Sequence, residues 1–208
     1  MTVRPFGDRA FLIELEQRID PAIVAAARAI ADAWERRGLG EAIPAYASVV
    51  VAFKPDRTPW KDAAAAAKAL AAEPPEPAAP VAGRIIEVPA VYDGPDLADT
   101  AARSGLSPAE LVALHSGRDY QAFFLGFMPG LAYCGTLDPR IDAPRLTSPR
   151  PRVPKGSIAV APGQTIVYPV DTPGGWRLIG RTDLAVFDPV REPAALIRAG
   201  DRLRFVPR

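Results

Sequence analysis

A proline-rich segment near residue 80 most constrains how this chain can fold. Residues 73–83 read E-P-P-E-P-A-A-P-V-A-G and contain four prolines. Proline lacks an amide hydrogen and has a fixed φ, so such a segment stays extended and enters neither a helix nor a central strand. The segment therefore predicts a boundary between a first domain, residues 1–83, and a second domain, residues 84–208.

The first domain has the pattern of a small α+β unit. Residues 10–15 (A-F-L-I-E-L) and 48–53 (S-V-V-V-A-F) are short apolar or β-branched runs, which are typical of strands. Asp20, followed by a proline, is an N-cap, and the apolar residues after it recur at spacings of three and four, as in a helix with one buried face. A second helix is expected over residues 58–72.

The second domain changes from helical patterns to strand patterns along its length. A strand over residues 85–91 is expected to precede two short helices, over residues 96–103 and 108–115, the second with a serine and glutamate in the capping-box positions. After these helices, short apolar runs alternate with Gly and Pro turns, which favours an all-β sandwich or barrel. The runs are residues 157–161, 164–168, 177–179, 184–187 and 202–206.

Composition and charge argue against several classes of protein. The 208 residues carry a net charge of +1, so no global field favours nucleic acid or a membrane surface. The chain has no G-x-x-x-x-G-K-[S/T] phosphate loop and no G-x-S-x-G nucleophile turn, and one His and one Cys form an unsuitable set for zinc. The single cysteine, interpreted as a small buried hydrophobe, excludes an internal disulfide. No signal-peptide pattern or apolar run of ~18 residues is present, so we expect a cytoplasmic protein.

The region between residues 115 and 182 is dense in glycine, proline, arginine and aromatic residues. It contains H-S-G-R-D-Y-Q-A-F-F-L-G-F-M-P-G-L-A-Y, P-R-L-T-S-P-R-P-R-V-P-K-G-S, P-G-Q-T-I-V-Y-P and P-G-G-W-R-L-I-G-R-T. So many fixed turns indicate loops held on a rigid scaffold, where ligand-binding groups usually lie. Residues 140–208 also carry twelve Lys and Arg against six Asp and Glu, which indicates either a small anionic ligand or solvated surface arginines.

These four segments resemble the signature of the KipI/PxpB family, also called allophanate hydrolase subunit 1. Its members carry H-S-x-x-x-Y near G-F-x-P-G-F-x-Y-L, then P-R-x-x-T-P-R-x-x-V-P-x-G-S, G-G-Q-T-G-I-Y-P and S-P-G-G-W-x-L-I-G-R-T. The segments G-D-R-A-F-L-I-E and P-A-Y-A-S-V-V-V match as well, so the resemblance covers nearly the whole chain. It implies an α+β fold, in which a small α+β N-terminal domain is followed by a cyclophilin-like β-barrel C-terminal domain.

The resemblance also implies a function, namely a subunit of an ATP-dependent 5-oxoprolinase that is active only with partner subunits. Such a complex hydrolyses 5-oxo-L-proline to L-glutamate with ATP cleavage. The implied partners are a KipA-like PxpC subunit and a LamB/YcsF-type PxpA subunit, and ATP is a co-substrate of the complex. KipI itself inhibits a sensor histidine kinase, so a kinase-binding regulator is the alternative. A third hypothesis is a carboxyltransferase-like role on urea-derived substrates, since urea carboxylase contains a related module.

The candidate catalytic residues are His115, Arg150 and Arg181. His115 is either a proton carrier or a structural histidine at a helix end. Guanidinium groups can bind a carboxylate or phosphate through two hydrogen bonds, but they can also pair with acids such as Asp138 or Asp142. The candidate substrate-binding residues, which share either a cationic or a neutral polar group, are Arg145, Arg152, Gln164, Thr165, Tyr168 and Thr182.

Aromatic residues in the same region have two interpretations each. Trp176 is either part of the core or a stacking platform for a ligand. The aromatic residues of the first segment either pack the barrel or form a subunit interface. They are Phe123, Phe124, Phe127 and Tyr133.

Overall fold

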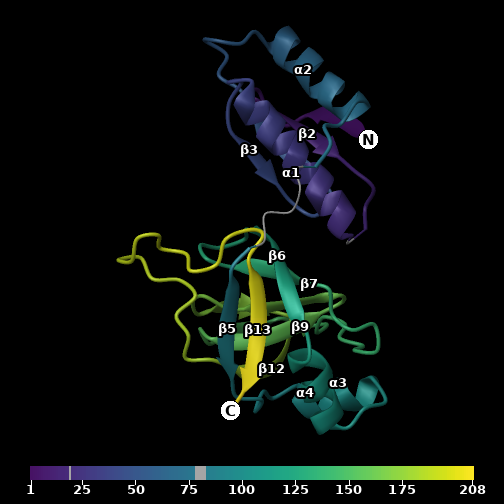
Figure 1. The fold of residues 1–208 in the computed structure, drawn as a ribbon, viewed down its shortest axis with the longest axis vertical. Helices are drawn as coiled ribbons and strands as arrows, with labels where there is room; N and C mark the ends of the chain where they lie inside the picture. The colour runs from purple at the N-terminus through teal and green to yellow at the C-terminus, as the bar shows by residue number, and fades with distance from the viewer. Residues whose placement is uncertain (19, 78–82) are drawn as a thin grey trace. The chain divides into compact units, whose positions relative to one another are not determined.

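The computed structural model of the chain describes residues 1–18, 20–77 and 83–208. Backbone contacts divide the chain into two compact units, Met1–Val81 and Ala82–Arg208, each of which is described by itself (Figure 1). Part of the predicted linker, residues 78–82, lies outside the described residues. The division into two independent domains at residues 83 and 84 stays a prediction.

The smaller unit is a four-stranded antiparallel sheet packed against two helices (Figure 1). The strand order is β1-β2-β4-β3. The elements are β1 (Thr2–Pro5), β2 (Ala10–Glu14), α1 (Pro21–Arg36), β3 (Ala42–Pro44), β4 (Ser48–Ala52) and α2 (Trp60–Ala72). The predicted strands and helices of this part of the chain are therefore confirmed, with small shifts at their ends.

The first helix of this unit begins and packs as its capping and apolar residues dictate. The Asp20 side chain accepts a hydrogen bond of 2.8 Å from the Ala22 amide, which satisfies one of the unpaired donors at the helix start. Ile30 and Trp34 are fully buried against the sheet, and the Trp34 indole N–H donates to the carbonyl oxygen of Ala52 at 2.8 Å. The apolar face therefore packs as predicted.

The larger unit is built around a seven-stranded sheet with the order β12-β9-β10-β7-β6-β13-β5. Among the described strands only β13 and β5 pair in parallel, and a separate two-stranded ribbon consists of β11 and β8. The first elements are β5 (Ile85–Ala90), α3 (Leu97–Arg103), α4 (Pro108–Ser116), β6 (Asp119–Leu125), β7 (Ala132–Gly135) and β8 (Arg150–Val153). The remaining strands are β9 (Ser157–Ala161), β10 (Gln164–Val167), β11 (Thr172–Gly174), β12 (Arg177–Arg181) and β13 (Arg202–Pro207).

The two edges of this sheet meet, so that it forms a nearly closed barrel. Val91, which follows β5, donates to the Arg181 carbonyl oxygen at 2.9 Å and accepts from the Arg181 amide at 2.8 Å. Closure of this kind satisfies backbone groups that an open edge would expose. The predicted barrel is therefore confirmed in its general form, and its cyclophilin-like character stays a prediction.

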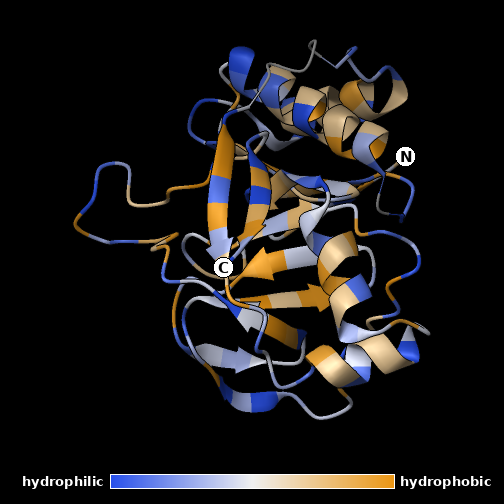
Figure 2. Ribbon diagram, turned by 60° about the horizontal axis from the view of Figure 1, so that its bottom comes forward, coloured by the Kyte–Doolittle hydropathy of each residue, from blue (hydrophilic) through white to orange (hydrophobic). Residues whose placement is uncertain are grey.

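The barrel wall has two faces with different neighbours, because successive side chains of a strand point to opposite sides. Figure 2 shows this alternation as orange and blue bands along strands. On β10, Val167 belongs to the large inner core, whereas Ile166 packs in a second cluster on the outer face. Val153 of the two-stranded ribbon packs in the outer cluster too. The part of the barrel wall that runs from β12 to β7 therefore has packed apolar side chains on both faces.

The two short helices lie together near one end of the barrel (Figure 1). Ser107 and Glu110 form the expected capping box, with the Ser107 hydroxyl accepting from the Glu110 amide and the Glu110 carboxylate accepting from the Ser107 amide. No helix among the described residues is long and apolar enough to span a membrane.

The predicted strand over residues 184–187 is wrong. Phe187 forms only an isolated bridge with Ala195, and the segment hydrogen-bonds to residues just downstream instead of joining the barrel. Pro189 and Pro193 flank this short loop. Because proline has no amide hydrogen to donate, these positions limit the length of any strand ladder.

Candidate functional site

His115 lies inside the barrel and takes part in a chain of hydrogen bonds. Its Nδ1 lies 2.7 Å from the Tyr92 hydroxyl, and its Nε2 lies 2.9 Å from the Thr165 hydroxyl. Because the Thr165 hydroxyl donates to the Ala159 carbonyl oxygen at 3.2 Å, it accepts from Nε2–H, and the Tyr92 hydroxyl then donates to Nδ1. A neutral imidazole therefore satisfies this chain.

The surroundings of His115 favour its neutral form. The imidazole is fully buried, with the rings of Tyr120 and Phe205 centred 5.2 and 4.5 Å away. Burial lowers the pKa of His115 to about 3, because the charged form would lose its hydration. This position favours the structural interpretation of His115 over a proton carrier, which needs a group that titrates near neutrality. Thr165 shares this buried position and contacts His115.

The outer face of the same wall gathers the groups that could bind a ligand. The outer-wall cluster consists of Tyr133, Arg145, Tyr168 and Trp176. The rings of Tyr133 and Trp176 meet edge to face with centroids 5.9 Å apart, and the Arg145 guanidinium carbon lies 5.6 Å from the centroid of the Trp176 ring. Within the described residues Arg145 has no carboxylate partner. Its exposed charge is therefore available to an anion.

Gln164 is a buried polar residue on the outer face of β10. Its side chain points away from Thr165 on the alternating strand, and only 8% of the residue is exposed. The directly opposite residues on the neighbouring strands are Ala161 and Gly135, so small groups flank it. Its Oε1 has no hydrogen-bond partner among the described residues. A buried acceptor without a donor costs about 1–3 kcal/mol, which makes Gln164 a candidate acceptor for a ligand N–H.

Tyr168 stands directly after β10 and is held by a close backbone approach. A Cβ at Gly174 would collide with the Tyr168 hydroxyl oxygen, so any other residue at that position of β11 would require the Tyr168 side chain to shift. Burial, with a smaller contribution from Tyr133, raises the pKa of Tyr168. The phenol therefore stays neutral and can offer a hydrogen bond to a ligand.

Two of the predicted catalytic arginines are held by carboxylates near the start of α3. Arg150 Nη2 lies 2.6 Å from Asp96, and Arg181 Nε lies 2.9 Å from Asp93. Asp96 also accepts from the Leu178 amide at 2.7 Å, which ties the helix start to the barrel. Three carboxylates spaced three residues apart thus each take one arginine: Asp93 with Arg181, Asp96 with Arg150, and Asp99 with Arg177. These acids were not predicted as partners, although their regular spacing is visible in the sequence.

The remaining predicted residues have local partners. Arg152 pairs with Asp171 at 2.6 Å, and the Thr182 hydroxyl accepts from the Leu184 amide at 3.1 Å. The alternative that the loop arginines form ion pairs was right for Arg150 and Arg152. The named partners were wrong, since these acids pair elsewhere: Asp138 with Arg118 and Arg140, and Asp142 with Arg103. Of the predicted set, the structure brings the charges of Arg145 and Arg150 near the Tyr168 phenol. Gln164 lies on the same outer face of β10, four residues before Tyr168, and Thr165 lies on the inner face with His115.

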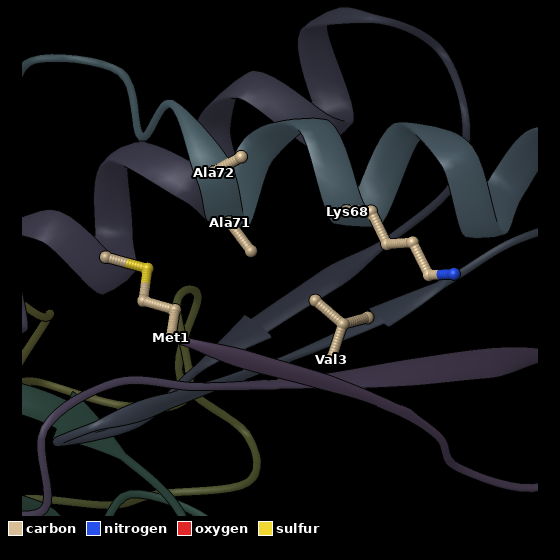
Figure 3. Close-up of a pocket in the computed structure, with 5 residues that line it drawn as sticks. All are labelled: Met1, Val3, Lys68, Ala71 and Ala72. Atoms are coloured by element: carbon tan, nitrogen blue, oxygen red, sulfur yellow. The ribbon is translucent and has the colours of Figure 1, made fainter.

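A shallow hollow in the smaller unit contains none of the predicted residues. It lies between β1 and α2, measures about 250 Å³ and is lined by Met1, Val3, Lys68, Ala71 and Ala72 (Figure 3). Its lining is mostly methyl groups, with one ammonium group at its edge. Among the described residues, no group of three or more His, Cys, Asp or Glu is placed to hold a metal ion.

The two-unit α+β fold and its sequence define a known class of protein. The family model described as carboxyltransferase domain, subdomain C and D, matches residues 1–197. The chain therefore belongs to this family. The 5-oxoprolinase subunit PxpB of Bacillus subtilis (strain 168) is 38% identical over 226 residues, covering 99% of this chain and 94% of that protein. The protein of the same name from Escherichia coli O157:H7 is 51% identical over 127 residues, covering 60% of this chain and 58% of that protein.

Solved structures share the fold. A crystal structure of TTHA0988 matches with a TM-score of 0.82 and 36% identity, covering 96% of this chain but only 40% of that one. The urea amidolyase of K. lactis matches with a TM-score of 0.80 and 19% identity, covering 99% of this chain and 15% of that one, which shows a shared fold alone. The fold thus also occurs within much longer chains. The predicted resemblance to the KipI/PxpB family is confirmed.

Proposed function

We propose that this chain is one subunit of an ATP-dependent 5-oxoprolinase, which converts 5-oxo-L-proline, ATP and two water molecules to L-glutamate, ADP and phosphate. The observation that carries this proposal is the 38% identity to a 5-oxoprolinase subunit, PxpB, over 99% of this chain and 94% of the relative. The alternative, a KipI-type inhibitor of a sensor histidine kinase, has no support among the relatives compared.

The substrate sets physical requirements that the outer-wall cluster could meet in part. A lactam is an amide stabilised by resonance, so its opening needs an activated oxygen, bound anions and a site from which bulk water is excluded. Arg145 is suited to a carboxylate or phosphate and Tyr168 to a polar atom of the lactam. Gln164, on the outer face of the same strand, is suited to accept from a ligand N–H. Arg150 and Arg181 are suited to hold the wall through their ion pairs, and the buried His115 to hold it from inside.

The proposed enzyme is a composite of several chains. This chain has no recognisable phosphate loop, so ATP binding is assigned to the complex and not to this subunit alone. The proposed partners are a KipA-like PxpC subunit and a LamB/YcsF-type PxpA subunit. In keeping with this, the chain corresponds to only 40% of TTHA0988, where the fold is part of a longer polypeptide.

The test is reconstitution from separate subunits. The chain is co-expressed with its candidate partners, and ATP-dependent release of glutamate from 5-oxoproline is measured with each subunit omitted in turn. Turnover that depends on this chain is expected, and equal turnover without it would refute the proposal. Arg145→Ala is expected to raise the KM for 5-oxoproline at least 10-fold. Arg202→Ala, which removes another exposed arginine, serves as the matched control.

A further inference from the structure

Phe127 adopts a backbone conformation that its side chain does not favour. It is the one residue other than glycine with a positive φ in the described part of the chain, at 70°. In this region the Cβ of an L-residue crowds its own backbone, so bulky side chains are rare there. Backbone strain of this kind persists where the surrounding structure enforces it, and it clusters at functional sites.

The ring of Phe127 is largely outside the packing of the subunit, because 78% of the residue is exposed. The loop that carries it connects β6 and β7 and is well anchored. The Gly126 amide donates to the Leu131 carbonyl oxygen at 3.1 Å, and Leu131 is almost fully buried. Met128 packs against the apolar cluster on the outer face of the barrel wall, which contains Ile166, while its neighbour Phe127 is exposed. The loop therefore presents one aromatic ring to the outside on a rigid frame.

The other side of the loop is fixed as well. Gly130 has a φ of 76°, and a Cβ there would lie 2.6 Å from the Cβ of Phe187. Met128 packs in the same buried cluster as Trp176, so the loop adjoins the outer-wall cluster. A polypeptide that seats the Phe127 ring would lie next to the candidate ligand groups.

We propose that Phe127 is an anchor that inserts into an apolar recess of the second subunit and so positions that subunit beside the outer-wall cluster. The occupant is a protein because relatives carry this fold joined to further polypeptide, as in TTHA0988, of which this chain covers 40%. Single aromatic residues held rigidly are typical anchors of protein interfaces, since they lose little conformational entropy on binding. This inference rests on the proposed function, which requires a partner subunit.

The test separates the ring from its backbone conformation. Phe127→Gly removes the ring and accepts the positive φ, Phe127→Ala removes the ring alone, and Phe127→Tyr keeps a ring. Phe6, 56% exposed in the smaller unit, gives the matched control Phe6→Ala. For each full-length variant, the Kd for the purified KipA-like partner and the Tm of the free subunit are measured.

We expect Phe127→Gly and Phe127→Ala to weaken partner binding at least 10-fold, while Phe127→Tyr and Phe6→Ala stay within about 3-fold of the parent chain. Phe127→Gly is expected to keep or raise the Tm, by up to about 4 °C, because glycine relieves the strain. A variant that is at least as stable alone but binds less tightly would support an anchor and exclude misfolding.

Unchanged partner affinity in both ring-deleted variants would overturn the anchor. If the KM for 5-oxoproline in the assembled enzyme were then higher as well, Phe127 would be a substrate platform instead. If the parent chain binds no partner at all, the proposed function itself fails, and this outcome is distinct from the loss of binding in the Phe127 variants alone.

Discussion

The buried His115 should make the stability of this protein depend on pH in a narrow and predictable window. The ordinary pKa of histidine is about 6.5, and burial lowers that of His115 to about 3 in the folded chain. Between these values the unfolded chain binds one proton that the folded chain does not. The contribution of His115 to the free energy of unfolding is therefore fully present above pH 6.5 and is lost as the pH falls from there toward 3.

The magnitude follows from the two pKa values. At pH 5, protonation of the unfolded chain lowers the free energy of unfolding by about 2 kcal/mol relative to pH 8. This figure barely changes if the folded pKa is 4 instead of 3, because the folded state is unprotonated at pH 5 in either case. With a urea dependence of about 1–3 kcal/mol per molar, the unfolding midpoint should fall by about 1 M.

The assay is urea unfolding of the full chain between pH 5 and 8, with His115→Asn as the reference. The chain has one histidine, so this variant removes every imidazole and should flatten the dependence over this range. In the folded parent chain the imidazole NMR signals should not titrate between pH 5 and 8. A titration of the folded protein near pH 6.5, or an equal slope in the variant, would refute the buried neutral histidine.

Three further predictions test other parts of the structure. Gln164→Leu is expected to keep or raise stability by about 1 kcal/mol in urea unfolding, because it removes a buried oxygen without a donor, while turnover of the reconstituted enzyme falls. Asp96→Ala is expected to lower the free energy of unfolding by about 3 kcal/mol, because it leaves the buried donors of Arg150 and Leu178 unpaired. Its control is Asp93→Ala, which removes a half-exposed ion pair and should change the free energy of unfolding by less than about 1 kcal/mol. Gly174→Ala should lower the Tm because its Cβ would meet the hydroxyl of Tyr168, and adding Tyr168→Phe should restore part of the loss; independent, additive effects would contradict this contact.

The local elements of this fold were largely predictable from the sequence. The N-cap Asp20 and the capping box at Ser107 act within a few residues of themselves, and both form as expected. The β-branched and alternating runs likewise form β4, β9, β10 and β13. The predicted strand over residues 184–187 failed because strand formation also needs a partner in the sheet, which local pattern does not supply.

The site was predicted only in part. The sequence alone indicated the region of the site and the residue types in it, since turns rich in glycine and proline and the run of arginines are visible without a fold. Tertiary structure decided which side chains meet: Gln164 and Thr165 are adjacent in sequence yet lie on opposite faces of one strand, and Arg150 meets Asp96 across 54 residues of chain. The physical reason is the distance along the chain over which each interaction acts. Capping and propensity act over a few residues, whereas the partner of a charge and the burial of an imidazole depend on how the barrel closes.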